Sequence, residues 1–402
     1  MTTAWQQTLS PAEQQMWIKP VRIQRSRSLD ADINAKYASR ELRIVTESNR
    51  EQLPNFVEAL KRPSWMELRP FYQRRARWDP ARQSRLIESF IMNIPVPPLF
   101  VFESDLAKYE VMDGQQRITA VRDFYANLYP LQGLEQWPEL NGRVYEKLPE
   151  EIRKGLDRRS ISYIVLLKES AETTEEQSLL RQQVFERLNT GGVELSHQEI
   201  RNSLYQGRFN DLLLELAKNN EFRKAWEMPP YDESERKRLP VDLAVNKSYQ
   251  MMRDVEVVLR FFALRHVDQY QRGMKGFLDL YMVRARAFTE IDIEYLRAQF
   301  TKAISVATQL YGDFIFRPWK PDEEAWADKP QVAFSDAVMV GISHNPDNHE
   351  RLISRREHVV EETKKLFETY ESGTFTGRGN TKQDVQDRIK FFEEMLNRVG
   401  GE

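Results

Sequence analysis

Apolar residues follow two different patterns along the chain. Up to about residue 167 they occur in short runs and short helical stretches divided by turn residues, which predicts mixed strands and helices. From Glu175 onward, nearly every stretch carries apolar residues at helical spacing, as over 251–267. The elements predicted in the first part are strands over 42–45, 99–102, 108–112 and 161–167, and helices over 49–61, 84–92 and 118–128.

These patterns predict an α+β fold class. We expect an α+β domain over 1–170 and an α-helical domain over 171–402. Ser196 and Glu199 have the spacing of a capping box, which predicts that a helix begins directly after Ser196.

Composition narrows the chemistry. The chain has 402 residues and no cysteine, which excludes disulfides, thiolate metal sites and cysteine nucleophiles. The formal net charge is −2, so the chain as a whole presents no basic field to nucleic acid, although Arg260, Arg265, Arg272 and Lys275 are candidates to line a local groove. The start lacks a signal-peptide pattern, and no run approaches the roughly 20 apolar residues of a membrane span. We therefore expect a cytoplasmic protein without membrane contact.

The stretch that carries most chemistry is Asp113-Gly114-Gln115-Gln116-Arg117, between a predicted strand and a predicted helix. Gly114 permits a sharp turn and a close approach of ligand to backbone, and the start of a helix attracts anions. Arg117 suits bidentate phosphate recognition, Gln115 and Gln116 suit phosphate oxygens or a water, and Asp113 suits Mg²⁺ or a hydroxyl. The plain alternative is an Asp-Gly turn before an ordinary exposed helix start.

Two further clusters are candidates to join this pocket. Gln73, Arg74 and Arg77 stand upstream and would focus positive charge beside Arg117, although a solvated basic loop is the commoner fate of such arginines. Asn189, in the sequence FERLNTGG, would contact a base, ribose or phosphate, or would simply end its helix.

The order of these motifs resembles one family closely. Gln73-Arg74, IESFIMNIPVPP, YEVMDGQQR and VFERLNTGG followed by LSHQEI resemble the N-terminal domain of GmrSD-type, modification-dependent restriction endonucleases, and more remotely the ParB nucleotide-binding domain and sulfiredoxin. The resemblance covers about residues 35–205. It implies a ParB/sulfiredoxin-like N-terminal domain, nucleotide binding and hydrolysis at the 113–117 motif, and a role in bacterial defence against foreign DNA. It carries over to Asp113 through Arg117, to Gln73 and Arg74, and to Phe185 and Asn189.

One part of the family pattern is missing from the sequence. Fused members carry a C-terminal nuclease module of the HNH type, which needs a closely spaced His/Asn/Asp set. The candidate cluster here is His344-Asn345-Pro346-Asp347-Asn348-His349, and a polar loop between helices is the favoured interpretation. Cleavage of DNA by a second module is therefore in doubt, and the nuclease is expected on a separate subunit.

The leading hypothesis is a nucleoside triphosphatase that senses or acts on DNA and uses Mg²⁺ or another divalent cation. Asp113 would hold the metal or activate water, Gln116 would orient water, and Arg74 and Arg117 would clamp phosphates. Asp113 and Arg117 are expected at a surface pocket, so that replacing them leaves folding intact. Three alternatives remain: a DNA nickase using the same pocket, a non-catalytic nucleotide switch for a partner, and a ParB-like DNA-binding regulator. Self-association is left open.

Overall fold

The protein divides into two compact units. Residues 24–195 form one, the sheet unit, and residues 1–23 together with 196–402 form the other, the helical unit. The structure is a computed structural model. It describes residues 9–17, 46–62, 65–67, 78–167, 184, 187, 196–205, 207–236, 240, 242–243, 246–371, 373–379 and 381–401.

The sheet unit contains a mixed five-stranded sheet in the order β1-β5-β3-β4-β2. β1 pairs with β5 and β3 pairs with β4 in antiparallel fashion, whereas β3 with β5 and β2 with β4 run parallel. The elements are β1 (Thr46–Gln52), α3 (Leu53–Ala59), β2 (Met66–Glu67), α4 (Pro80–Ile91), β3 (Leu99–Asp105), β4 (Lys108–Asp113), α5 (Gln115–Tyr125), α6 (Glu150–Asp157), β5 (Ser160–Leu166) and two 3₁₀ turns, η3 (Pro138–Leu140) and η4 (Tyr145–Lys147).

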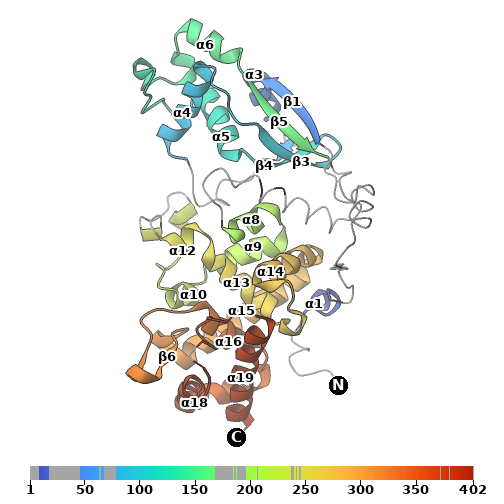
Figure 1. Cartoon of the computed structure of the whole chain (residues 1–402), viewed down its shortest axis with the longest axis vertical. Coiled ribbons are helices and arrows are strands. Elements are labelled where there is room, and N and C mark those ends of the chain that lie inside the picture. Colours follow the sequence, from blue (N-terminus) through green and yellow to red (C-terminus); the bar gives the residue numbers. More distant parts are fainter. Residues whose placement is uncertain are drawn as a thin grey trace, which may run out of the picture. The chain divides into compact units, whose positions relative to one another are not determined.

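The core of the sheet unit forms where its helices meet the sheet. Figure 1 shows α4, α5 and α6 gathered on one side of the strands. Leu53 and Phe56 of α3, Ile87 of α4 and Ile118 of α5 are buried together with Val101 of β3 in one apolar cluster. This packing fixes the end of β4 and the start of α5, which carry the predicted motif.

Most of the predicted elements of this unit are confirmed, and one is wrong. The helix expected over 49–61 begins only at Leu53, because Thr46–Gln52 form strand β1 instead. Every residue of β1 has a partner in β5, from Thr46 opposite Leu166 to Gln52 opposite Ser160. Long-range strand pairing therefore outweighs the local helical pattern. A short stretch of sequence does not reveal such pairing. The strand expected over 42–45 lies outside the described residues.

The helical unit contains short and long helices from both ends of the chain. Ser196 and Glu199 form the predicted capping box at the start of α8. Its elements are α1 (Pro11–Gln15), α8 (His197–Leu204), α9 (Arg208–Leu216), α10 (Asn220–Ala225), η7 (Glu233–Arg236), α12 (Lys247–Gln250), α13 (Arg253–Leu264), η8 (Val267–Gln269), α14 (Gly273–Arg284), η9 (Ala285–Ala287), α15 (Glu290–Tyr311), η10 (Gly312–Phe314), β6 (Trp319–Lys320), η11 (Pro321–Glu323), β7 (Ala325–Trp326), α16 (Val332–Ser343), η12 (Pro346–Asn348), α17 (His349–Ser354), α18 (Arg356–Thr369) and α19 (Lys382–Gly401).

Two ion pairs are buried inside the helical unit. Arg260 of α13 pairs with Asp336 of α16, and Arg265 pairs with Glu13 of α1. Two arginines predicted as candidates for a groove are therefore buried instead, because each finds a carboxylate on another element.

The α+β class with a largely helical second part is confirmed. The boundary near residue 170 stays a prediction, because most of residues 168–195 lie outside the described residues. Residues 9–17, which the sequence division put in the first domain, instead pack within the helical unit. In the portion of the chain that the structure describes, no helix has both the length and the apolar character to cross a membrane.

Candidate functional site

The predicted motif lies at a sharp turn between β4 and α5. Asp113 ends the strand, Gly114 is the N-cap residue with φ of +98°, and α5 begins at Gln115. That left-handed conformation disfavours any residue with a side chain. A Cβ at Gly114 would also lie 2.3 Å from Cδ2 of Leu99, which is fully buried. The glycine is thus required both by the turn and by the close packing of β3 beneath it.

Asp113 and Arg117 face each other across this turn. Arg117 Nη2 donates to Asp113 Oδ2 at 2.6 Å, and Arg117 Nη1 donates to the carbonyl oxygens of Pro97 and, at 3.2 Å, Pro98. The Asp113 side chain is 30% exposed, whereas that of Arg117 is only 11% exposed. Burial lowers the pKa of Arg117, and the nearby Asp113 offsets this only in part.

These contacts correct one expectation from the sequence. Arg117 is mostly buried and ties the helix start to the segment that precedes β3, so it has a structural role besides its chemistry. Asp113 is the more open of the two. In the described residues, no hydrogen bond to its second oxygen, Oδ1, is formed. An incoming group therefore meets Asp113 before it meets the guanidinium of Arg117.

The two glutamines of the motif differ in exposure. Gln115 is buried, and Gln116 is partly exposed. Gln116 Oε1 accepts a hydrogen bond from the backbone N–H of Trp78 at 3.3 Å, and Arg82 lies over the Trp78 ring at 5.0 Å from its centroid. Residue 78 therefore lies against the start of α5. Its upstream neighbours Gln73, Arg74 and Arg77 lie outside the described residues, as do Phe185 and Asn189.

Sequence reasoning missed two buried polar residues on α4, which hold backbone groups of residues 132–137. Glu88 Oε1 accepts from the backbone N–H groups of Gln136 and Trp137, both at 2.9 Å, and Ser84 Oγ accepts from Gln132 N at 3.0 Å. Both lie on the face of α4 that also carries its buried apolar residues. A polar residue at such a position was the available signal, since buried polar groups need partners.

A second missed group closes the far end of α5. The Asp157 carboxylate accepts from the hydroxyls of Tyr125 at 2.9 Å and Tyr145 at 3.0 Å, and the two rings stack at 4.4 Å. Burial, followed by the hydrogen bond to Asp157, raises the pKa of Tyr145 to about 12. Both tyrosines thus stay protonated donors at neutral pH and hold α5 in place.

The His344–His349 stretch is the turn between helices that the sequence favours. His344 caps the end of α16 and its Nε2 lies 3.2 Å from the carbonyl oxygen of Arg265, while His349 Nε2 lies 2.9 Å from that of Ile342. Glu235, in the mixed-charge sequence over 231–238, pairs with the buried Arg223 at 2.6 Å. Across the described parts of both units, no three His, Asp or Glu side chains are grouped to hold a metal ion.

The observed features define an α+β domain that presents a carboxylate and a guanidinium at a strand-to-helix turn. Residues 57–206 match the family described as GmrSD restriction endonuclease, N-terminal domain. The chain therefore carries a GmrSD-type N-terminal domain, the family whose motifs the sequence resembles. No curated protein and no solved structure matches the chain. The remoter likeness to ParB and sulfiredoxin stays a prediction.

Proposed function

We propose that this domain binds a nucleoside triphosphate and hydrolyses it as one step of a DNA-restriction system. The observation that carries the proposal is the partly exposed Asp113 carboxylate, which stands at the start of α5 inside a GmrSD-type domain. The start of α5 contributes a positive dipole end for phosphate oxygens, and Gly114 lets a ligand approach the backbone. The turn supports nucleotide binding, and the family match supports the setting in a restriction system.

The roles of the motif residues follow from their contacts. Asp113 accepts a proton from water or holds a metal ion, because it is the open carboxylate at the turn. Gln116, which is partly exposed, orients the attacking water. Arg117 keeps Asp113 and the segment before β3 in register and adds positive charge at 2.6 Å from the carboxylate. The phosphate clamp then falls mainly to Arg74 and Arg77, with Gln73 and Asn189 completing the pocket.

Asp113 could bind a divalent cation together with the phosphates of a bound nucleotide. Mg²⁺ is commonly held by one or two carboxylates together with substrate phosphates and waters. A single exposed carboxylate, Asp113, suits that arrangement, and no protein cage is needed. When bound, the cation would neutralise charge on the phosphate oxygens.

Phosphate release by the purified full chain tests the proposal. Each nucleoside triphosphate is supplied with Mg²⁺, with and without DNA, to the wild type and to the Asp113→Asn variant. We expect Asp113→Asn to lose at least about hundredfold in rate, because a positioned proton acceptor typically contributes that much. Asp105→Asn is the matched control, since Asp105 is an exposed carboxylate in the same sheet whose Oδ1 accepts only from its neighbour Leu106 at 2.9 Å among the described residues.

The same experiment separates the alternatives. DNA cleavage by the purified chain that Asp113→Asn abolishes would replace nucleotide hydrolysis with nicking at the same site, as the family description "restriction endonuclease" suggests. Thermal protection by nucleotide without phosphate release would indicate a switch that acts on a separate nuclease subunit. DNA binding without any effect of nucleotide would favour the ParB-like regulator. Equal phosphate release by wild type and Asp113→Asn would refute the proposed role of Asp113.

A further inference from the structure

The N-terminal segment Leu9–Trp17 enters the helical unit as a short, separate piece. Its helix α1 has only five residues, and isolated helices of that length are not stable in water. The position of the segment therefore depends on its contacts with the rest of the unit. Ser10 and Glu13 are fully buried there, and they cap α1 through a capping box.

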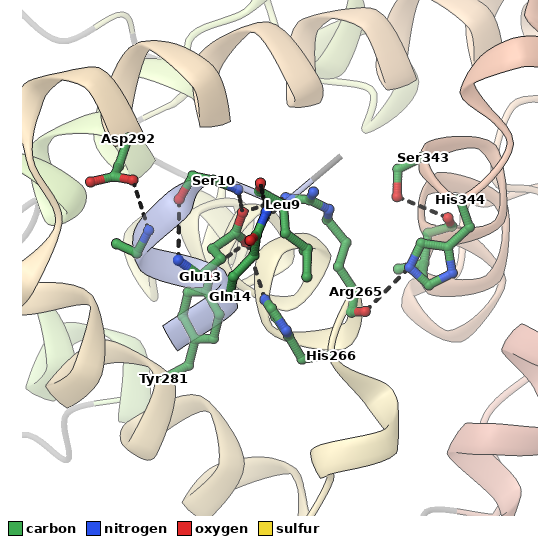
Figure 2. Close-up of polar contacts among 12 residues, drawn as sticks. Leu9, Ser10, Glu13, Gln14, Arg265, His266, Tyr281, Asp292, Ser343 and His344 are labelled. Atoms are coloured by element: carbon green, nitrogen blue, oxygen red, sulfur yellow. Dashed lines mark hydrogen bonds and ion pairs between the residues drawn. The ribbon is translucent and has the colours of Figure 1, made fainter. Parts of the chain in front are cut away.

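A pocket of donors surrounds the Glu13 carboxylate (Figure 2). Glu13 Oε1 lies 3.1 Å from each of Arg265 Nη1, His266 Nε2 and Tyr281 Oη. Oε2 accepts from the backbone N–H of Ser10 at 2.9 Å. Burial alone raises the pKa of Glu13, but Arg265 and His266 outweigh it and keep the pKa below its ordinary value. The pocket thus receives an ionised carboxylate with a complete set of donors.

Further polar and aromatic contacts anchor the middle of the segment and its C-terminal end. Asp292 Oδ1 accepts from Ala12 N at 3.2 Å, and Figure 2 shows Asp292 beside the segment. At the C-terminal end, Trp17 stacks on Phe277 at 5.7 Å. Arg284 lies 4.6 Å over the Trp17 ring and donates to the carbonyl oxygen of Met16 at 2.6 Å. Charged groups, hydrogen bonds and an aromatic stack therefore all hold the segment.

Such a contact suits a docked peptide better than a core element. A buried ion pair gives less stability than apolar packing of the same volume, and its best-attested use is to specify a register or a switch. When the segment leaves, Ser10, Glu13 and Gln14 are readily hydrated. The next described residue after Trp17 is Thr46, the start of strand β1 in the other unit.

We propose that residues 9–17 are a releasable clasp, a peptide of this chain docked through Glu13 in a carboxylate-recognising pocket of Arg265, His266 and Tyr281. The clasp is the part of the helical unit that precedes the sheet unit in the sequence, and the rest of the helical unit follows the sheet unit. The proposal does not depend on nucleotide turnover.

Exchange of the segment tests the proposal. A protease site is inserted between Ile23 and Gln24 of the full chain, and the folded protein is cut and labelled on its N-terminal fragment. We expect the fragment to stay bound after cleavage and to be displaced by excess synthetic peptide of residues 1–23. A Glu13→Gln peptide should compete at least about tenfold more weakly, because it loses hydrogen bonds to charged groups. A Gln15→Ala peptide should compete like the wild type, since Gln15 is exposed on the same helix.

A control variant tests whether the effect is specific to the Glu13 contact. Glu235→Gln in the protein changes another buried glutamate paired with an arginine, and it should leave fragment exchange unchanged. Equal competition by the Glu13→Gln peptide, or loss of helical signal on cleavage, would overturn the proposal.

Hydrogen exchange on the uncut chain gives a second measurement that needs no insertion. The amides of Glu13 and Gln14 should exchange much faster than those within α13 and α15 through local opening. Exchange as slow as in those helices would mean that the segment is permanent core.

Discussion

Two carboxylate–guanidinium pairs in this protein have the same chemistry and different surroundings. Asp113 and Arg117 meet at a distance of 2.6 Å with side chains 30% and 11% exposed. Glu13 and Arg265 meet at 3.1 Å with both side chains at 0%. The residues of the first pair lie four positions apart at one turn, whereas those of the second lie 252 positions apart in the sequence.

The difference in exposure gives the two carboxylate–guanidinium ion pairs different roles. A carboxylate with one oxygen open to solvent can exchange its partner for water, a metal ion or a proton at little cost. A carboxylate whose donors are all sealed with it can leave only if its whole segment leaves, because an unpaired buried charge is strongly unfavourable. The Asp113 carboxylate is therefore suited to binding or reacting with a ligand, whereas the Glu13 carboxylate is suited to anchoring its segment.

The largest effect is expected from changing the turn itself. Gly114→Ala should lower the free energy of unfolding of the sheet unit by about 2–4 kcal/mol, from the left-handed conformation and the clash with Leu99 together. Gly142→Ala is the control for conformation alone, because Gly142 has φ of +82° and no heavy atom within 4 Å of an added Cβ. Urea unfolding measures both. Equal losses in the two variants would show that Leu99 moves aside freely.

A smaller loss should follow from removing the arginine of the turn. Arg117→Ala is expected to cost about 1–3 kcal/mol of unfolding free energy, since it breaks charged hydrogen bonds to Asp113 and to the Pro97 and Pro98 carbonyls. Arg122→Ala on the same helix should change the melting temperature little, because Arg122 is exposed and pairs with its neighbour Asp123. If Arg117→Ala melts like wild type yet loses phosphate release, Arg117 would bind phosphate and would not stabilise the fold.

The smallest effect is a pH dependence of the helical unit. Burial lowers the pKa of His266 below its ordinary value of 6.5 despite the hydrogen bond to Glu13, and burial lowers that of His349 as well. As the pH falls below 6.5, the unfolded chain binds protons that the folded chain does not, so stability declines. Below the ordinary value of 4.5, Glu13 adds to the decline, because its folded pKa is lower.

Urea midpoints from about pH 7.5 to about pH 5.5 measure the histidine part of this slope. His266→Asn should reduce the pH dependence of the urea midpoint. The double variant, which carries His266→Asn and His349→Asn together, should remove most of it. A slope unchanged in the double variant would contradict the assignment to these two residues.

The local parts of the site could be predicted from the sequence. The short apolar run before Asp113 and the Asp-Gly dipeptide indicate a strand, a turn and a helix, and the capping box at Ser196 indicates a helix start. These features depend on neighbours within four residues. The pairing of Asp113 with Arg117 is of the same kind, although its consequence, the burial of Arg117, also needs the carbonyls of Pro97 and Pro98.

The parts that could not be predicted depend on distant partners. Thr46–Gln52 pair with β5 more than a hundred residues later, so the helical pattern over 49–61 is misleading. Arg265 looks like a surface cation on an amphipathic helix until Glu13 is brought to it by tertiary folding. No local pattern contains either contact, because the energy comes from elements that meet only in the folded chain.

The sequence separation of Glu13 and Arg265 also determines when their contact can form during protein synthesis. They are separated by 252 residues, and synthesis proceeds at about 5–20 residues per second, so Glu13 is added to the chain roughly 13–50 s before Arg265. During that interval the intervening GmrSD-type domain is made and is free to fold first. Closure of the N-terminal segment on the helical unit can therefore occur only late in translation, after the whole of that domain has been synthesised.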